Sequence, residues 1–269
     1  MVKKLFKHEF FAYARVMAIV YGILLTIATA TRIILIFESN TTAHQIVSIF
    51  SLIVYGFSAV AAFLFSFAMG IIRFYKNLFT AEGYLSFTLP VTAGQHIAVK
   101  AVTAVSIDWT TLIMVALSAC IVTPGEVLTE IWRTLIGIPA ELYEVIGIHC
   151  LLVGGEFVIL LLAASFSSIM LYYTFISIGQ LSKKNRILAA VGAYFVFYII
   201  SQVVSTVLTI LLSAVAMSGI FADIAYWIYL HPIASVHIFM WGAILLTTVF
   251  VLIEFFVIRW IITKKLNLE

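Results

Sequence analysis

The chain has 269 residues, of which 64% are hydrophobic and 10% are charged, and its mean hydropathy is +1.18. Soluble domains carry about 25% charged residues, so this composition argues against a water-soluble domain and predicts an integral membrane protein. The net charge is only +3 and there are two cysteines, which predicts no disulfide framework, no cysteine-based metal cluster and no nucleic-acid partner.

Six segments are long and apolar enough to cross a bilayer, which takes about 20 apolar residues in a helix. We expect an all-α integral membrane fold, with residues 1–269 forming a single transmembrane permease domain. The first segment is too long for the core of a signal peptide, and no small-residue cleavage site follows it, so we expect a retained anchor. The predicted spans cover residues 16–37, 46–72, 101–122, 146–178, 187–217 and 236–258.

The basic residues orient this arrangement. All but two of the 15 lysines and arginines lie at the N-terminus, between spans 2 and 3, between spans 4 and 5, or after span 6. The exceptions are Arg32 and Arg133. Cytoplasmic loops carry an excess of Lys and Arg, so we expect a multi-pass protein of the cell membrane with both termini in the cytoplasm.

Residues 2–15 have an amphipathic helical pattern, with apolar side chains on one face and basic side chains on the other. A basic amphipathic helix beside a span favours the headgroup plane, so we expect an interfacial helix. The alternative is a flank that only sets the topology. The apolar face holds Leu5, Phe6, Phe10 and Tyr13, and the basic face holds Lys3, Lys4, Lys7 and Arg15.

The connection over residues 74–97 is too long for a turn and too aromatic for a solvated loop. Gly83 permits a positive φ and is expected to end a short helix there, and Pro90 stops any further helix. Thr92 and Gln95 have the spacing of a capping box that restarts a helix into span 3. This pattern predicts a compact element that is either a docking surface or a lipid-facing interfacial segment.

Two stretches resemble the permeases of bacterial ABC-2-type transporters, in particular a Gram-positive subgroup. Arg73–Lys100 is similar to the intracellular loop of that family, and Ser177–Leu181 is similar to its junction between spans 4 and 5. The basic N-terminal helix and the six spans also match the family's layout. The resemblance covers most of the chain in layout and these two stretches in residue detail.

The resemblance implies that the loop between spans 2 and 3 contains a coupling helix that engages a separate ABC ATPase. It implies a permease subunit of an ATP-binding cassette exporter, working with a second permease copy or a homologue in the lipid bilayer. The cargo is then an amphiphilic molecule such as a peptide, a drug or a lipid. The coupling residues are Glu82, Gly83, Tyr84, Leu85 and Pro90.

The family also has a re-entrant hairpin between spans 5 and 6, for which Ser218–Ser235 is the candidate. The amphipathic connection Pro124–Gly147 departs from the family pattern, and we expect it to lie on the outer leaflet. The sequence has no G-x-x-x-x-G-K-[ST] phosphate loop and no hydrolase motif. We therefore expect no enzyme activity and no cofactor on this chain, with ATP and Mg²⁺ held by the partner.

Three carboxylates, Asp108, Glu156 and Glu254, fall within predicted spans. An ionisable residue there costs roughly 2.5–3.5 kcal/mol on insertion scales, so each needs a partner or a wet cavity. They are candidates for the lining of a translocation path, or for structural hydrogen bonds to a neighbouring helix. His149 and His237, at span ends, are expected to be hydrogen-bonding residues and not metal ligands.

These carboxylates also define a second functional hypothesis, an ATP-independent secondary transporter that uses them as a proton relay. A membrane-embedded enzyme is a third hypothesis, which no group of residues supports. Small residues at four-residue spacing in span 2 allow close helix approach. They fit either a permease–permease interface or packing within the chain, and they are Ser58, Ala62, Ser66 and Gly70.

Overall fold

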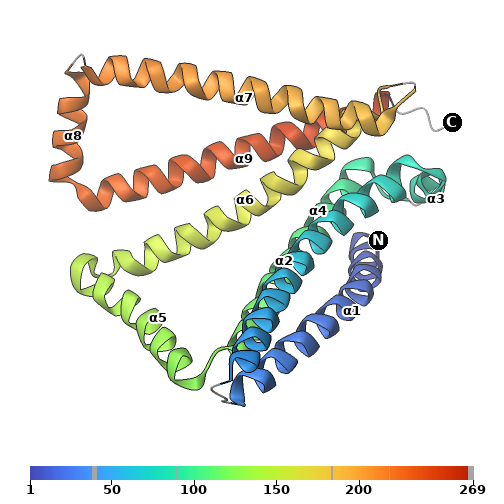
Figure 1. Cartoon of the computed structure of the whole chain (residues 1–269). Helices are drawn as coiled ribbons and strands as arrows, with labels where there is room; N and C mark the ends of the chain where they lie inside the picture. The colour runs from blue at the N-terminus through green and yellow to red at the C-terminus, as the bar shows by residue number, and fades with distance from the viewer. Residues whose placement is uncertain (38–40, 89, 183, 218, 266–269) are drawn as a thin grey trace. The chain divides into compact units, whose positions relative to one another are not determined.

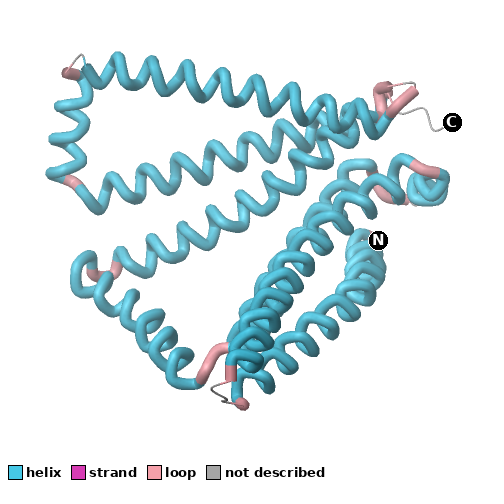
Figure 2. The backbone as a smooth tube through the Cα atoms, in the orientation of Figure 1, coloured by secondary structure: helices cyan, strands magenta, loops and turns pink. Residues whose placement is uncertain are grey.

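The computed structural model describes residues 1–37, 41–88, 90–182, 184–217 and 219–265. Over these residues it contains nine α-helices and no β-strand (Figure 2). The predicted all-α fold is confirmed. The chain forms two compact units, Met1–Pro139 and Ala140–Glu269. The division falls inside α5 (Gly125–Ile146), directly after Pro139, whose ring nitrogen has no hydrogen for a helical hydrogen bond.

The first unit is built on three long helices, α1 (Val2–Ile36), α2 (Thr42–Phe79) and α4 (Ala93–Val122), each of which contacts the other two (Figure 1). The short helix α3 (Ala81–Thr88) packs against α2. On α1, buried residues recur every three to four positions, which is the spacing of one helical face. That buried stripe consists of Tyr13, Met17, Tyr21, Leu24, Ala28 and Thr31.

The N-terminal segment and the first predicted span form one continuous helix. The four apolar residues of the predicted amphipathic face are buried or half-buried, and the four basic ones are exposed. The amphipathic pattern is therefore confirmed, while its position in a headgroup plane stays a prediction.

In the segment between α2 and α4, the predicted capping box is confirmed, and the predicted helix end at Gly83 is wrong. The capping box is present: the Gln95 N–H donates to Thr92 Oγ1 at 3.3 Å, and the Thr92 N–H donates to Gln95 Oε1 at 2.9 Å. Gly83, however, lies inside α3 and does not end it. Its N–H donates to the Thr80 carbonyl at 2.8 Å, and a helix interior tolerates glycine at a cost of about 1 kcal/mol. The helix continues to Thr88, two residues before Pro90.

The second unit contains α6 (His149–Gly179), α7 (Arg186–Met217), α8 (Ile220–Leu230) and α9 (Pro232–Lys264). Helix α6 packs against both α7 and α9. Helix α8 joins the end of α7 to the start of α9 (Figure 1). The proposed hairpin Ser218–Ser235 contains α8 and the start of α9, and its first residue lies outside the described residues. Its re-entrant geometry stays a prediction.

Among the described residues, six helices are long and apolar enough to cross a membrane: α1, α2, α4, α6, α7 and α9. By length and composition they agree with the six predicted spans and with a multi-pass membrane protein. Each has 30 to 38 residues, more than the hydrocarbon core requires, so the helices extend beyond the predicted span limits. The amphipathic connection predicted over Pro124–Gly147 is the helix α5, in which no residue is buried.

Candidate functional site

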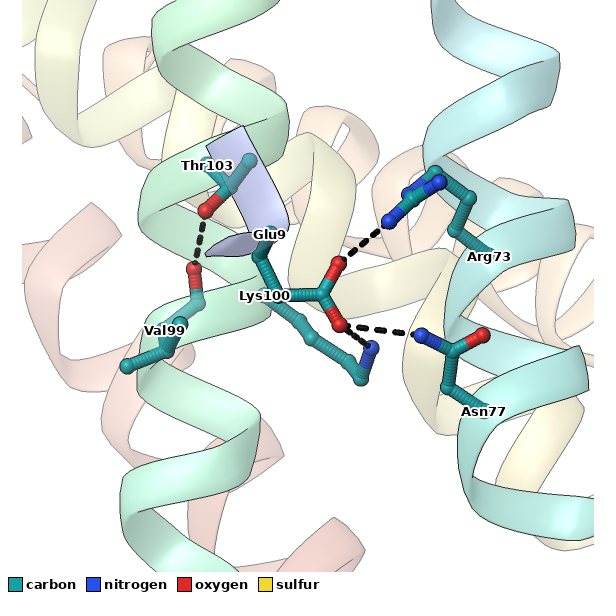
Figure 3. A network of polar contacts seen from close by, with 6 residues as sticks. All are labelled: Glu9, Arg73, Asn77, Val99, Lys100 and Thr103. Carbon is teal, nitrogen blue, oxygen red and sulfur yellow. Dashed lines mark hydrogen bonds and ion pairs between the residues drawn. The ribbon is translucent and has the colours of Figure 1, made fainter. Parts of the chain in front are cut away.

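A buried ionic cluster joins the three long helices of the first unit. Glu9 on α1 accepts a hydrogen bond at 2.7 Å from Arg73 and one at 2.9 Å from Asn77, both on α2. The Lys100 ammonium on α4 donates to Glu9 Oε1, the same oxygen that accepts from Asn77, at 2.6 Å. Figure 3 shows the single carboxylate placed between the two helices that supply these donors. One side chain therefore connects α1 to both of its neighbours.

The charged side chains of this cluster are largely shielded from solvent, so the two cations depend on Glu9 as their charged partner. The side chain of Lys100 is 6% exposed, that of Glu9 12% and that of Arg73 22%. The Arg73 guanidinium also lies 5.7 Å from the centre of the Tyr13 ring, close enough for a cation–π contact. A buried cation without its partner is costly. The Glu9 carboxylate is the ion-pair partner of both the Lys100 ammonium and the Arg73 guanidinium.

A second set of polar contacts continues along α1. The Tyr13 hydroxyl donates to the Ser66 carbonyl, and the Ser66 hydroxyl donates to Asp108 Oδ1 at 2.5 Å. Further along, the hydroxyls of Tyr21 and Thr111 are 2.7 Å apart. Asp108, a candidate for the translocation path, is therefore hydrogen-bonded to a neighbouring helix of its own unit. This contact agrees with the alternative role given for Asp108 in the sequence analysis, a structural hydrogen bond to a neighbouring helix.

The small-residue stripe of α2 lies mostly inside the first unit. Ala62, Ser66 and Gly70 are buried, and Ser58 is half-buried. A Cβ on Gly70 would lie 3.3 Å from the Cβ of Ala104 on α4. The burial of these three residues matches packing within the chain, and Ser58 is the most accessible member of the stripe.

The predicted coupling residues lie on and after α3. Glu82, Tyr84 and Pro90 are exposed, with Tyr84 at 55%, and Gly83 is buried. The side chain of Leu85 lies outside the described residues. Glu82 and Tyr84 are two residues apart, so the exposed carboxylate and the exposed ring lie on either side of the buried Gly83 and do not share one helical face.

The packed side of α3, which carries Gly83 and Phe87 four residues apart, contacts α4. The ring of Phe87 lies 6.0 Å from the ring of His96 in an edge-to-face arrangement, and His96 is 2% exposed. Such aromatic pairs stabilise a contact by about 0.5–1.5 kcal/mol beyond the area they bury. Together with its packing on α2, this contact ties the short helix to two membrane-length helices.

The second unit contains a separate polar chain. His237 on α9 contacts Glu156 on α6 through Nδ1, at 2.9 Å to each carboxylate oxygen. Its Nε2 lies 3.0 Å from Nδ1 of His149, at the start of α6. The predicted hydrogen-bonding role of the two histidines is confirmed. In the described part of the chain, no group of three or more His, Cys, Asp or Glu residues is arranged to hold a metal ion.

Glu254 on α9 is 9% exposed, and its Oε2 has no hydrogen-bond partner among the described residues. It lies about 25 Å further along α9 than His237, at 1.5 Å per residue. Glu156 and Glu254 are therefore far apart in the second unit, and Asp108 belongs to the first. Within their own units, the three predicted path carboxylates occupy three different environments.

Sequence reasoning missed the ionic cluster because it assigned Arg73 and Lys100 to topology alone. A signal was present: Glu9 lies four residues from Leu5 and four from Tyr13, so it is the acidic member of the apolar face of α1. When such a face is buried, its single carboxylate needs a cation as partner, because an unpaired buried charge is costly.

Comparison with protein-family models gave no match, and neither did comparison with curated proteins or with solved structures. The described part of the chain defines a helical protein in which six helices are long and apolar enough to cross a membrane.

Proposed function

We propose that this chain is the membrane-spanning permease subunit of an ABC-2-type exporter. It lies in the cell membrane with both termini in the cytoplasm and forms the translocation path with a second permease, identical or homologous. Separate ABC ATPase subunits bind ATP and Mg²⁺ and supply the energy. The cargo is an amphiphilic molecule, in the class of peptides, drugs and lipids.

The arrangement of α3 is the observation that supports this proposal most. An ATPase that moves against a permease needs a contact that is accessible on one side and fixed to spanning helices on the other. Helix α3 exposes Glu82 and Tyr84, while Phe87 is held by His96 on α4. Because Glu9 links α1 to α2 and α4, a displacement of α3 would reach all three long helices. Rigid-body rocking of such a bundle is one established way to switch access.

The absence of a phosphate loop from the sequence is consistent with a partner that binds the nucleotide. A docking test follows from the two exposed side chains of α3. The double variant Glu82→Gln with Tyr84→Ala is expected to lose most of the ATPase that co-purifies with the tagged full-length chain, because it removes the Glu82 charge and the exposed Tyr84 ring while leaving Phe87 and His96 unchanged. Candidate ABC ATPases are co-expressed with the tagged chain, the membranes are solubilised, and the chain is purified through its tag. The measurement is the rate of ATP hydrolysis in the eluate.

Tyr143→Ala is the matched control, because Tyr143 on α5 is 54% exposed, close to the 55% of Tyr84. This variant is expected to retain the ATPase. Equal recovery of ATPase activity with the double variant and with the control would show that α3 is not the docking element.

An ATP-independent secondary transporter is the second candidate function. The observation that favours it is the contact of Glu156 with a histidine chain in the second unit. A carrier of that kind would be driven by a pH gradient and would need no ATPase.

A further inference from the structure

Glu156, His237 and His149 form an unbranched chain of titratable groups connected by short hydrogen bonds. The contacts are 2.9 Å between the carboxylate and His237 and 3.0 Å between the two imidazoles. The side chain of Glu156 is 9% exposed and that of His237 20%. Both nitrogens of the central imidazole are therefore engaged, one with the carboxylate and one with the second imidazole.

The direction of each hydrogen bond in the chain follows from the protonation state of Glu156. A carboxylate only accepts, so with Glu156 ionised His237 donates from Nδ1. If His237 is neutral, its Nε2 accepts from Nδ1–H of His149, and the chain carries one negative charge. A proton added at Nε2 of His149 then lets His149 pass its Nδ1 proton to His237, and His237 pass its Nδ1 proton to Glu156. One proton enters, both hydrogen bonds reverse direction, and the chain ends neutral with Glu156 protonated.

A cavity of about 650 Å³ gives the chain an opening. His149 and His237 line it together with His231, and the other lining residues are apolar. We propose that His149 and His237 are a proton relay between this cavity and the buried carboxyl of Glu156. This inference goes beyond the permease function and does not depend on an ATPase.

In α6, in α8 and in residues 231–258, histidines are the only basic side chains. Residues 134–182 and 187–258 contain no lysine or arginine, so α6, α8 and the part of α9 beside the chain have no permanent cation. His231 faces the same cavity, and Cys150 follows His149 in α6. The remaining titratable residues toward this end of the unit are exposed side chains, Glu141, Tyr143 and Glu144 on α5 and Asp223, Tyr226 and Tyr229 on α8.

The test is the rate at which Glu156 takes up a proton after a downward pH jump. The purified full-length chain, in lipid vesicles, is followed by time-resolved infrared absorption of the protonated carboxyl, which is assigned to Glu156 by its loss in Glu156→Gln. In His237→Gln the amide still donates and accepts but cannot pass a proton on, so uptake is expected to slow by about tenfold or more, within the range of proton-transfer effects. His149→Gln is expected to slow it similarly.

His231→Gln is the control, because His231 lines the same cavity but has no hydrogen bond to the chain among the described contacts. It is expected to leave the rate unchanged. If the histidines had a purely structural role, their substitution would lower the thermal stability of the protein. It would leave the rate of proton uptake by Glu156 unchanged in a folded variant. An unchanged rate in both His149→Gln and His237→Gln, or equal slowing in His231→Gln, would overturn the relay. If His237→Gln does not fold, His149→Gln alone decides.

Discussion

Glu9→Ala is expected to destabilise the first unit by about 3–5 kcal/mol, the cost of leaving a buried charge without its partner. Lys100 is 6% exposed and bonds to Glu9 at 2.6 Å, so the substitution strands its ammonium in an apolar setting, while Arg73 loses its carboxylate as well. The measurement is the midpoint of thermal or denaturant unfolding of the purified chain in detergent. Glu130→Ala, on an exposed face of α5, is the control and should change stability by no more than about 0.5 kcal/mol.

A second substitution separates the buried charge from simple loss of packing. Lys100→Met removes the stranded cation, so the double variant Glu9→Ala with Lys100→Met should recover a large part of the lost stability. Contacting residues couple in such cycles by about 0.5–3 kcal/mol. Additive effects of the two substitutions, or a Glu9→Ala protein as stable as the Glu130→Ala control, would show that the cluster does not hold the three helices together.

Gly179→Ala is expected to destabilise the second unit by about 1–3 kcal/mol, the usual cost of overpacking. Gly179 ends α6 against the first turn of α7. An added Cβ would lie 2.6 Å from both the Arg186 carbonyl oxygen and the Ala190 Cβ, and 2.9 Å from the Ala190 nitrogen. These distances are too short for carbon contacts, which are optimal at about 3.5–4.0 Å. Two of the atoms belong to the backbone, which moves only if the helix moves.

The control is Gly155→Ala on the same helix, where a Cβ would meet no atom within 4 Å. Alanine is the better helix former, so this variant should match or exceed the stability of the original chain. Thermal unfolding in detergent measures both. Equal midpoints for the two variants would contradict the close packing of α6 on α7.

The helices were predictable because a bilayer admits few structures. Lipid offers no hydrogen-bond partner to the backbone, so a long apolar segment must be helical. Local signals were also sufficient for the capping box at Thr92, since its two bonds join residues three apart. The prediction at Gly83 was wrong because glycine permits a helix end but does not require one.

The candidate site was less predictable because its contacts join residues far apart in the chain. Glu9 meets Arg73 across 64 positions and Lys100 across 91, and no periodicity in one sequence specifies such pairs. The three intramembrane carboxylates were recognised individually, but their partners were not. Ser66 binds Asp108 and His237 binds Glu156 only once the helices pack.

The proposed requirement for a partner ATPase is tested most directly in liposomes that contain the purified chain. The probe is a fluorescently labelled amphipathic peptide, and its transport is followed with a pH gradient alone and then with the ATPase and ATP. The chain alone should move nothing under the gradient, while ATPase and ATP should produce flux that disappears when the catalytic carboxylate of the ATPase is neutralised. Gradient-driven flux by the isolated chain, abolished by Glu156→Gln, would contradict the ABC permease and establish the secondary transporter.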